Sequence, residues 1–251
     1  MLALKLVVVP AFLALLSLAA RRWGPGFAGW LAGLPVVAGP ILVFIALERG
    51  APFASDAASA SLAALGATVS FCIAYPRTAP AAGWPRALAG ALATWLAIAS
   101  VLSVLPSSLA LSLAIALAAL AAAPRLIPAV GGPVRGRRLA HGEVALRMAA
   151  GAALTVAVTT IAAAVGARWS GLLAVFPVLS LVLTVFTHRA QGADAVTALL
   201  RGMATGMYSF IGFCGVLSLA VPGAGIAGGF VLALAASLGI QALTLRRHAG
   251  R

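Results

Sequence analysis

Long apolar runs, separated by short polar, glycine-containing or proline-containing breaks, make up most of the chain. A helix that crosses the hydrocarbon core of a bilayer needs about 20 apolar residues. Nine runs meet or approach that length, so the pattern predicts an all-α polytopic bundle of about nine spans. The predicted spans cover residues 2–20, 27–47, 56–75, 87–105, 108–124, 143–165, 170–187, 195–220 and 225–245.

The fifth of these spans, 108–124, is the shortest and needs separate support. Pro106 is followed by Ser107 and Ser108, a sequence typical of a turn that leads into a helix N-cap. We therefore expect a helix to begin directly after Ser108, although whether it crosses the membrane completely stays open at this point.

The composition supports a lipid-covered molecule. Apolar residues make up 63% of the chain and charged residues only 8%, and the mean hydropathy is +1.12. A soluble domain carries roughly a quarter charged residues. The excess of 17 Lys and Arg over four acidic residues would suggest nucleic acid in a soluble protein. Here the basic residues lie between apolar runs, so topology explains them better and no nucleic-acid partner is expected.

The basic residues also predict the orientation of the chain. With nine spans, 14 of them fall on one side and three on the other, whereas removing the fifth span gives 12 and five. Positively charged loops stay in the cytoplasm. We therefore predict a multi-pass protein of the bacterial inner membrane, with its N-terminus outside and its C-terminus cytoplasmic. The cytoplasmic set is Arg21, Arg22, Arg77, Arg86, Arg125, Arg135, Arg137, Arg138, Arg147, Arg189, Arg201, Arg246, Arg247 and Arg251; the external set is Lys5, Arg49 and Arg168.

The first span is similar to a cleavable signal peptide, because Lys5 precedes an apolar run that ends in Ser17-Leu18-Ala19. Arg21 and Arg22 follow immediately and outweigh Lys5. Since positive charge after a first span retains that side in the cytoplasm, we expect this segment to remain as a transmembrane helix.

The two halves of the sequence carry similar landmarks in the same order. Arg22-Trp23-Gly24, Leu34-Pro35 and Ser70-Phe71-Cys72 in the first half correspond to Arg168-Trp169-Ser170, Phe176-Pro177 and Ser209 to Cys214 in the second. This predicts one four-helix repeat in residues 1–105, a linking span and basic loop in 106–142, and a second repeat in 143–251. Five spans separate the start of the first repeat from the start of the second, so the second repeat enters the membrane inverted. Inverted repeats are typical of secondary transporters; duplication without transport is the alternative.

The second repeat resembles the GlpM family of small four-helix bacterial inner-membrane proteins. The resemblance rests on Phe176-Pro177, the loop at Arg189, and Gly206-Met207-Tyr208-Ser209, and it covers about residues 143–246. The first repeat is a weaker match that keeps Pro35 and Ser70 and lacks the Gly-Met pair. The resemblance implies a four-helix unit that pairs with itself, so a homodimer is one expectation. It also implies a link to exopolysaccharide (alginate-like) production.

The overall plan is also similar to that of the drug/metabolite transporter group, which uses inverted helical repeats. Small multidrug transporters of this plan place a carboxylate inside their first helix for proton coupling. Spans 1 and 6 contain no such residue, because Glu48, Asp56, Glu143 and Asp194 all fall in or beside loops. Proton-coupled drug antiport is therefore disfavoured.

Prolines and hydroxyl side chains supply the first candidates for a substrate site. Pro35, with Pro40 nearby, and Pro177 interrupt spans 2 and 7 at corresponding places, and a proline frees a backbone carbonyl one turn earlier. In lipid that carbonyl needs a protein or water partner. Such a pair of broken helices either frames a substrate site or simply kinks for packing. The hydroxyl candidates are Thr68, Ser70, Thr205, Tyr208 and Ser209.

The hydroxyl groups admit two interpretations. Thr205 lies three residues before Tyr208 and four before Ser209, so the three share a helix face. Facing inward they would line a small polar cavity, and facing another helix they would form hydrogen bonds worth about 0.6 kcal/mol per pair. The Gly202-xxx-Gly206 spacing in the same span predicts a close helix approach.

Arg201 is the remaining candidate, because it stands near the predicted membrane boundary with Asp194 seven residues earlier. An arginine inside the membrane would suit an anionic substrate or a lipid head group. An arginine at the boundary would only extend its side chain to the cytoplasmic surface. Both interpretations stay open at the level of sequence.

Enzyme chemistry has no recognisable signature. The three histidines lie in loops or the tail, and Cys72 and Cys214 lie in apolar runs without metal-binding spacing. We expect no catalytic residues, no metal site and no cofactor. The predicted function is a transporter or flippase-like carrier of a small solute or lipid-linked intermediate, with membrane lipid as its other partner. The alternative is a non-transporting component that supports envelope polysaccharide production.

The charge distribution gives a direct test of topology. A reporter fused after Arg251 is expected to be cytoplasmic, and one inserted in the 222–224 turn is expected to be periplasmic, because 14 basic residues share the predicted cytoplasmic side. Alkaline phosphatase and green fluorescent protein fusions measure this. Detection of both positions on one side would contradict the ninth span or the span count.

Overall fold

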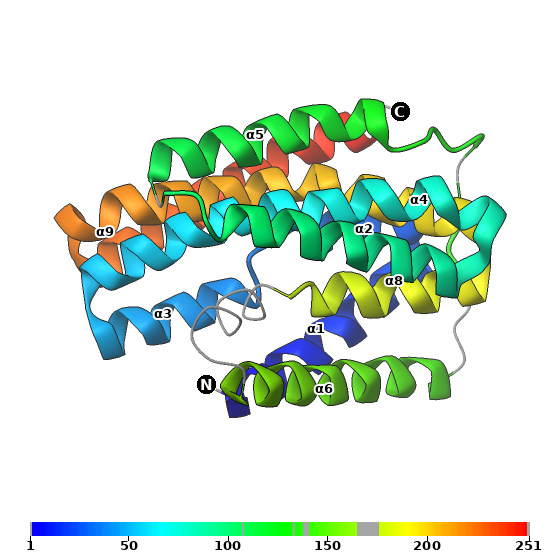
Figure 1. The fold of residues 1–251 in the computed structure, drawn as a ribbon, viewed down its shortest axis with the longest axis horizontal. Helices are drawn as coiled ribbons and strands as arrows, with labels where there is room; N and C mark the ends of the chain where they lie inside the picture. Colours follow the sequence, from blue (N-terminus) through cyan, green and yellow to red (C-terminus); the bar gives the residue numbers. More distant parts are fainter. Residues whose placement is uncertain (1, 107, 133, 138–140, 165–175, 250–251) are drawn as a thin grey trace.

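The described part of the chain is mostly helical. The computed structural model describes residues 2–106, 108–132, 134–137, 141–164 and 176–249, and within these ranges it contains eight helices and no strand (Figure 1). The helices are α1 (Leu2–Trp23), α2 (Pro25–Ala32), α3 (Ala38–Arg49), α4 (Ala51–Leu102), α5 (Leu109–Leu126), α6 (His141–Ala164), α8 (Val178–Gln191) and α9 (Ala193–Ala249). Five of them, α1, α4, α5, α6 and α9, contain segments long and apolar enough to cross a membrane, which indicates an integral membrane protein.

Two of the helices are each divided by a glycine. Gly83 in α4 and Gly225 in α9 have non-helical backbone angles, with φ of 69° and 71°. Glycine adopts positive φ without the steric cost that other residues bear. The chain reverses direction at both points, so α4 and α9 each form two arms, and their reversals lie at opposite ends of the molecule (Figure 1). The helix count therefore does not by itself confirm nine spans, and that number stays a prediction.

The glycines at the helix junctions follow the same plan in both halves. Gly50 joins α3 to α4 with φ 85° and ψ 174°, and Gly192 joins α8 to α9 with φ 85° and ψ −172°. Gly192 lies 142 positions after Gly50, and Gly225 lies 142 positions after Gly83. The same offset relates Pro35 to Pro177 and Phe71-Cys72 to Phe213-Cys214. These landmarks therefore recur at one offset, and the backbone angles at the two pairs of glycines agree.

The first arms of α4 and α9 pack against each other as an antiparallel pair. Near the start of α4, the Ser59 hydroxyl lies 2.7 Å from the hydroxyl of Ser218, which is late in the first arm of α9. Farther along α4, the Cys72 sulfur lies 3.9 Å from that of Met203, which is early in α9. Contacts that run in opposite order along two helices require the helices to point in opposite directions. These two arms form the centre of the buried core.

The closest helix crossing joins α2 to α9. Gly29 and Gly33 on α2 face Gly202 and Gly206 on α9, and a Cβ built at any of the four would overlap backbone atoms of the other helix. The Gly202-xxx-Gly206 spacing therefore marks a close approach, as the sequence predicted. Small residues at such positions let the two backbones touch, which is how helices gain packing energy in lipid.

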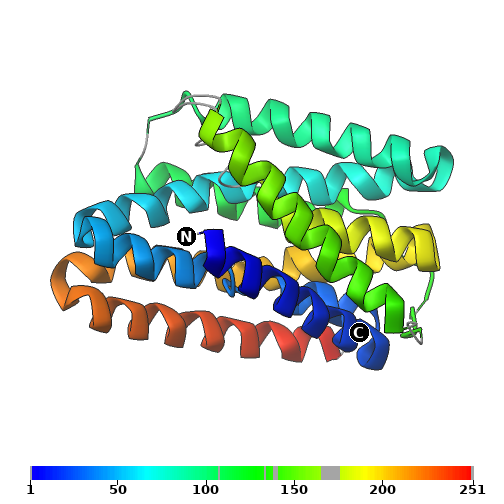
Figure 2. The same ribbon diagram turned by 90° about the horizontal axis from the view of Figure 1, so that it is seen from below.

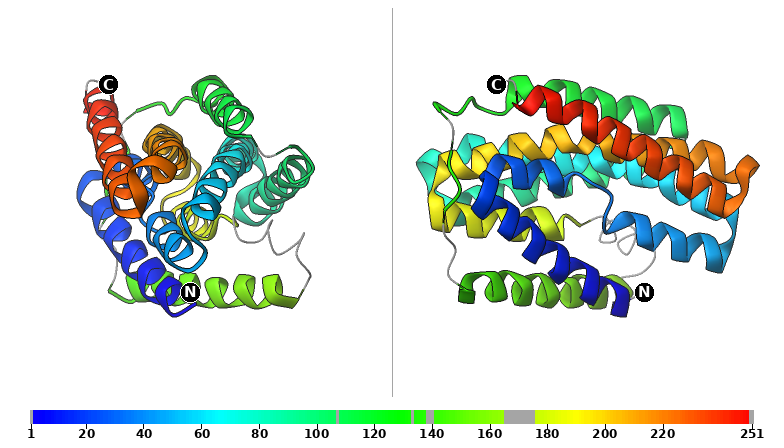
Figure 3. Two further views of the ribbon diagram at one scale, coloured as in Figure 1. Left: turned by 90° about the vertical axis from the view of Figure 1, so that its left-hand side faces the viewer. Right: turned by 180° about the vertical axis from the view of Figure 1, so that it is seen from behind.

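The remaining helices lie around this core. In α5 the Ser108 hydroxyl accepts a hydrogen bond from the Leu111 amide at 3.2 Å, which confirms the predicted N-cap. Helix α5 runs along the outside of the bundle beside α4 and α9 (Figure 3). On another face α1 and α6 lie side by side (Figure 2).

The α2–α9 crossing gives a stability prediction. Gly206→Ala places a Cβ against the Trp30 carbonyl oxygen, and overpacking of this kind costs about 1–3 kcal/mol. We expect a lower midpoint in denaturant unfolding in detergent. Gly239→Ala is the matched control, because a Cβ at Gly239 in the same helix meets nothing within 4 Å and alanine favours helix by up to about 1 kcal/mol. Equal effects of the two substitutions would contradict the crossing.

Candidate functional site

A partly open cavity of about 220 Å³ lies between the C-terminal half of α5 and the first arm of α9. Its lining combines an apolar wall with three polar side chains that the sequence had singled out. The polar residues are Arg201, Thr205 and Tyr208, and the apolar residues are Leu120, Pro124, Ile127 and Ala204. The polar residues recur at intervals of four and three along one helix, so they face the same side.

Arg201 is held at this site by the end of α5. Its Nη1 donates to the Ile127 carbonyl at 2.7 Å and to the Pro128 carbonyl at 3.1 Å. Nearby, the Nε of Arg77 donates to the Leu126 carbonyl at 3.0 Å. The last carbonyls of a helix have no intrahelical partner. The two arginines therefore satisfy the C-terminal end of α5, and Arg201 does so from within the cavity wall.

The two hydroxyl groups in the cavity differ in the hydrogen bonds that they can still form. Thr205 donates to the Arg201 carbonyl at 3.0 Å within its own helix, which leaves its oxygen free to accept. The Tyr208 hydroxyl makes no hydrogen bond to any described residue, and its side chain is half-buried in the cavity wall. A phenolic hydroxyl both donates and accepts. Tyr208 is thus the most available uncharged polar group in this cavity.

Pro124 adds an acceptor to the opposite wall. It stands inside α5, four residues after Leu120, and both residues line the cavity. Proline has no amide hydrogen, so the Leu120 carbonyl lacks its usual helical donor. A backbone acceptor freed in this way needs another partner in an apolar environment. The α5 wall therefore supplies a carbonyl without its usual helical donor as well as apolar surface.

The break at Pro35 is packed rather than open. Helix α2 ends at Ala32 and α3 begins at Ala38, so the chain is interrupted around this proline. The Leu34 amide donates to the Leu31 carbonyl at 3.1 Å, and the Gln241 side chain donates to the Trp30 carbonyl at 3.0 Å. These contacts satisfy the carbonyls before the break, and Pro35 is not among the residues that line the cavity.

The other candidates lie apart from the cavity. Ser209 is fully buried against the break, and its hydroxyl donates to the Gly206 carbonyl of its own helix at 2.7 Å. Ser70 likewise donates to Ala67 in its own helix at 2.7 Å. Thr68 is half-buried, and Pro177 stands directly before α8. Arg201, Thr205 and Tyr208 are therefore the candidates that the structure brings together.

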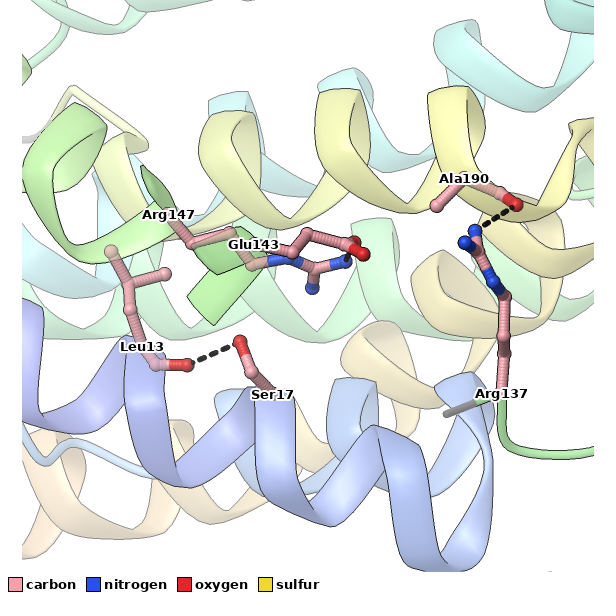
Figure 4. Close-up of polar contacts among 6 residues, drawn as sticks. All are labelled: Leu13, Ser17, Arg137, Glu143, Arg147 and Ala190. Carbon is pink, nitrogen blue, oxygen red and sulfur yellow. Dashed lines mark hydrogen bonds and ion pairs between the residues drawn. The ribbon is translucent and has the colours of Figure 1, made fainter. Parts of the chain in front are cut away.

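Sequence reasoning missed a buried arginine in α6, because Arg147 was counted only as one of the basic residues on the cytoplasmic side. Its side chain is only 1% exposed, and its Nη2 donates to the Glu143 carboxylate at 2.8 Å. The guanidinium also lies 5.5 Å from the ring centre of Phe186 in α8. Figure 4 shows this ion pair, with Arg137 reaching the Ala190 carbonyl of α8 nearby at 2.8 Å. The four-residue spacing of Glu143 and Arg147 was the available signal.

Two interhelical contacts also escaped the sequence analysis. The Tyr75 hydroxyl and His188 Nδ1 lie 2.9 Å apart and join α4 to α8. At the other end of α4, Ser55 and Ser59 contact Ser218 of α9. Neither contact has a local sequence signal, because the partners are more than 100 residues apart. Among the described residues, no group of three or more His, Cys, Asp or Glu side chains is placed to hold a metal ion.

Thiol labelling tests whether the cavity admits water. Cys72 and Cys214 are buried, so the unmodified protein is expected to resist a membrane-impermeant maleimide. In a background without these cysteines, we expect Tyr208→Cys to react and Ser209→Cys to stay unreactive, because the first side chain lines the cavity and the second is fully buried. Mass spectrometry measures the adduct. An unreactive Tyr208→Cys, or equal labelling at both positions, would contradict this cavity.

Comparison with protein-family models, with curated proteins and with solved structures gave no match to this chain. The resemblance of residues 143–246 to the GlpM family therefore stays an expectation that rests on the motifs alone. The function of the chain has to be argued from its own geometry.

Proposed function

We propose that this chain is a carrier in the bacterial inner membrane that moves a small solute or a lipid-linked intermediate. The observation that carries this proposal is the α5–α9 cavity, which gathers Arg201, Thr205 and Tyr208. A cavity inside a bundle of apolar helices, with a few polar groups on an otherwise apolar wall, is typical of a ligand site.

The carrier is built, in this proposal, from nine spans arranged as two inverted four-helix repeats joined by α5. The matching junction glycines, 142 positions apart in both pairs, support the repeat. The antiparallel packing of the first arms of α4 and α9 supports the inversion, because these arms occupy equivalent places in the two halves. Inverted repeats allow one half to rock against the other around a shared site.

The orientation proposed has the basic end of the bundle in the cytoplasm. Arginines that are far apart in sequence meet there. Arg77 and Arg201 hold the end of α5, Arg137 holds the end of α8, and Arg189 lies 5.6 Å from the ring centre of Trp84. Positively charged segments of bacterial membrane proteins stay on the cytoplasmic side. In this proposal the N-terminus is outside, the C-terminus is inside and Arg201 is near the inner surface.

The second candidate function is a non-transporting component that supports envelope polysaccharide production, in the manner that the GlpM resemblance implies. The observation that favours it is the close packing between the Pro35 break and α9. Gly33 touches Gly206 there, with no room for a side chain. A carrier that changes shape needs this region to separate or rotate, whereas a scaffold does not. A homodimer belongs to the same proposal.

Native mass spectrometry followed by reconstitution separates the two functions. We expect the purified protein to retain a solute or lipid, and Tyr208→Phe to weaken its binding by about 1 kcal/mol, the scale of one hydrogen bond. Ala204→Trp fills the cavity and is expected to abolish retention, whereas Gly239→Ala, which lies outside the cavity, is expected to leave it unchanged.

The identified ligand, in fluorescent or isotopic form, is then loaded into proteoliposomes. Protein-dependent movement across the bilayer that Ala204→Trp abolishes supports a carrier. Binding without movement supports the scaffold. Retention of no ligand, or retention that none of the cavity substitutions alters, contradicts both the site and the carrier.

A further inference from the structure

We infer that the α5–α9 cavity binds a phosphate ester, with Arg201 holding the anionic group and the apolar wall holding the rest of the molecule. This inference rests on the proposed function, since it names the substrate class of the same site.

The charge of Arg201 is the first part of the argument. Its Nη1 hydrogens are occupied by the Ile127 and Pro128 carbonyls, so the three hydrogens on Nε and Nη2 have no partner among the described residues. The one ion pair between described residues joins Arg147 to Glu143, so Arg201 has no carboxylate within ion-pair distance there. A guanidinium edge that is fixed at one end and open at the other suits an anion with two adjacent oxygens.

The shape of the cavity gives the second part. Arg201 and Tyr208 are seven residues apart on α9, which corresponds to about 10 Å along the helix axis. A simple inorganic anion is too small to reach both groups, whereas an ester with a polar linkage beyond the phosphate can do so. Leu120 and Ala204 are buried apolar residues in the wall between α5 and α9. The site therefore fits a molecule with an anionic end, a middle that can accept from a hydroxyl, and apolar surface.

The level of Arg201 in the bundle gives the third part. Helix α5 has 18 residues, so it is about 27 Å long and barely spans the hydrocarbon core. Arg201 contacts the two residues that follow its C-terminal end, Ile127 and Pro128. This places the guanidinium at the membrane boundary on the basic side, where the phosphates of lipids lie. A lipid-borne phosphate can therefore reach it from within the bilayer.

Binding measurements on the full-length protein in detergent test this inference. The probes are a short-chain phosphatidylglycerol, a monoacylglycerol of the same chain length without phosphate, and glycerol 3-phosphate, each titrated by native mass spectrometry. We expect Arg201→Gln to weaken phosphatidylglycerol binding at least about tenfold, as loss of a charge-assisted hydrogen bond would. Arg77→Gln is the matched control, because Arg77 also holds the end of α5 but is not part of the cavity lining. It is expected to change binding less than about twofold, well below that tenfold loss.

The possible outcomes distinguish a soluble ligand from a lipid, and an effect specific to Arg201 from a general effect of losing an arginine at the end of α5. If glycerol 3-phosphate binds and competes with phosphatidylglycerol, the ligand is a soluble phosphate ester. If only phosphatidylglycerol binds, the ligand is a lipid head group. Either result supports the inference. Equal binding of the phosphate-free lipid, or equal losses in Arg201→Gln and Arg77→Gln, overturns it. Arg201→Lys keeps the positive charge and serves as the folded comparison if the glutamine variant is unstable. Because an ammonium group cannot contact two adjacent oxygens as a guanidinium does, we expect the lysine variant to bind phosphatidylglycerol more weakly than the unmodified protein, and unchanged binding would also overturn the inference.

The result is independent of whether the protein transports. Arg201-dependent binding of a phosphate ester without movement across proteoliposomes retains the inference and rejects the carrier. Movement of a ligand that is neutral, with no effect of Arg201→Gln, retains the carrier and rejects the inference.

Discussion

Backbone contact between α2 and α9 is the constraint on which the arrangement of this molecule depends. In lipid, apolar side chains gain little by leaving one apolar environment for another, so helices associate through close packing. Four glycines meet at this crossing, and a methyl group on any of them would collide with the other backbone. The crossing fixes the face that α9 turns toward α2. On a different face of α9, Thr205 and Tyr208 therefore point toward α5, where the cavity forms.

The end of α5 shows how the fold uses charge inside an apolar bundle. Carbonyls at a helix end are costly to leave unpaired where water is scarce. Arg77 and Arg201 donate to three successive carbonyls there, from Leu126 to Pro128. One guanidinium thus links α4 to this helix end and the other links α9 to it. An arginine that secures the backbone through one nitrogen keeps its remaining donors, so structural and binding roles coexist in one side chain.

Local signals in the sequence predicted the elements well where a single segment decides the outcome. The apolar run 2–20 corresponds to α1, and the Ser108 cap correctly begins α5. The spacing of Thr205 and Tyr208 placed these two residues on one face, and the cavity contains both of them together with Arg201. Which helix covers that face could not be predicted, because α5 reaches it only through the tertiary fold.

The same limitation explains the residues that were misplaced or missed. A four-residue spacing grouped Ser209 with Thr205, yet one residue beyond Tyr208 the helix has turned about 100° toward α2. Ser209 is therefore buried at the glycine crossing instead of the cavity. Arg147 was counted on the cytoplasmic side by its charge, whereas packing against Phe186 of α8 covers it. When a helix that is distant in the sequence buries a side chain, the local sequence pattern around that side chain does not predict it.

The reversal at Gly225 has a consequence for how the protein is made. The chain turns there at a single glycine, and residues 202–245 contain no charged side chain. Insertion of this hairpin into a bilayer therefore moves no charge across the hydrocarbon, where each would cost several kcal/mol. The two arms can enter together as a preformed pair, because neither carries a charge within these residues. A charged residue introduced at this reversal would hinder insertion into the membrane before it affected the folded structure.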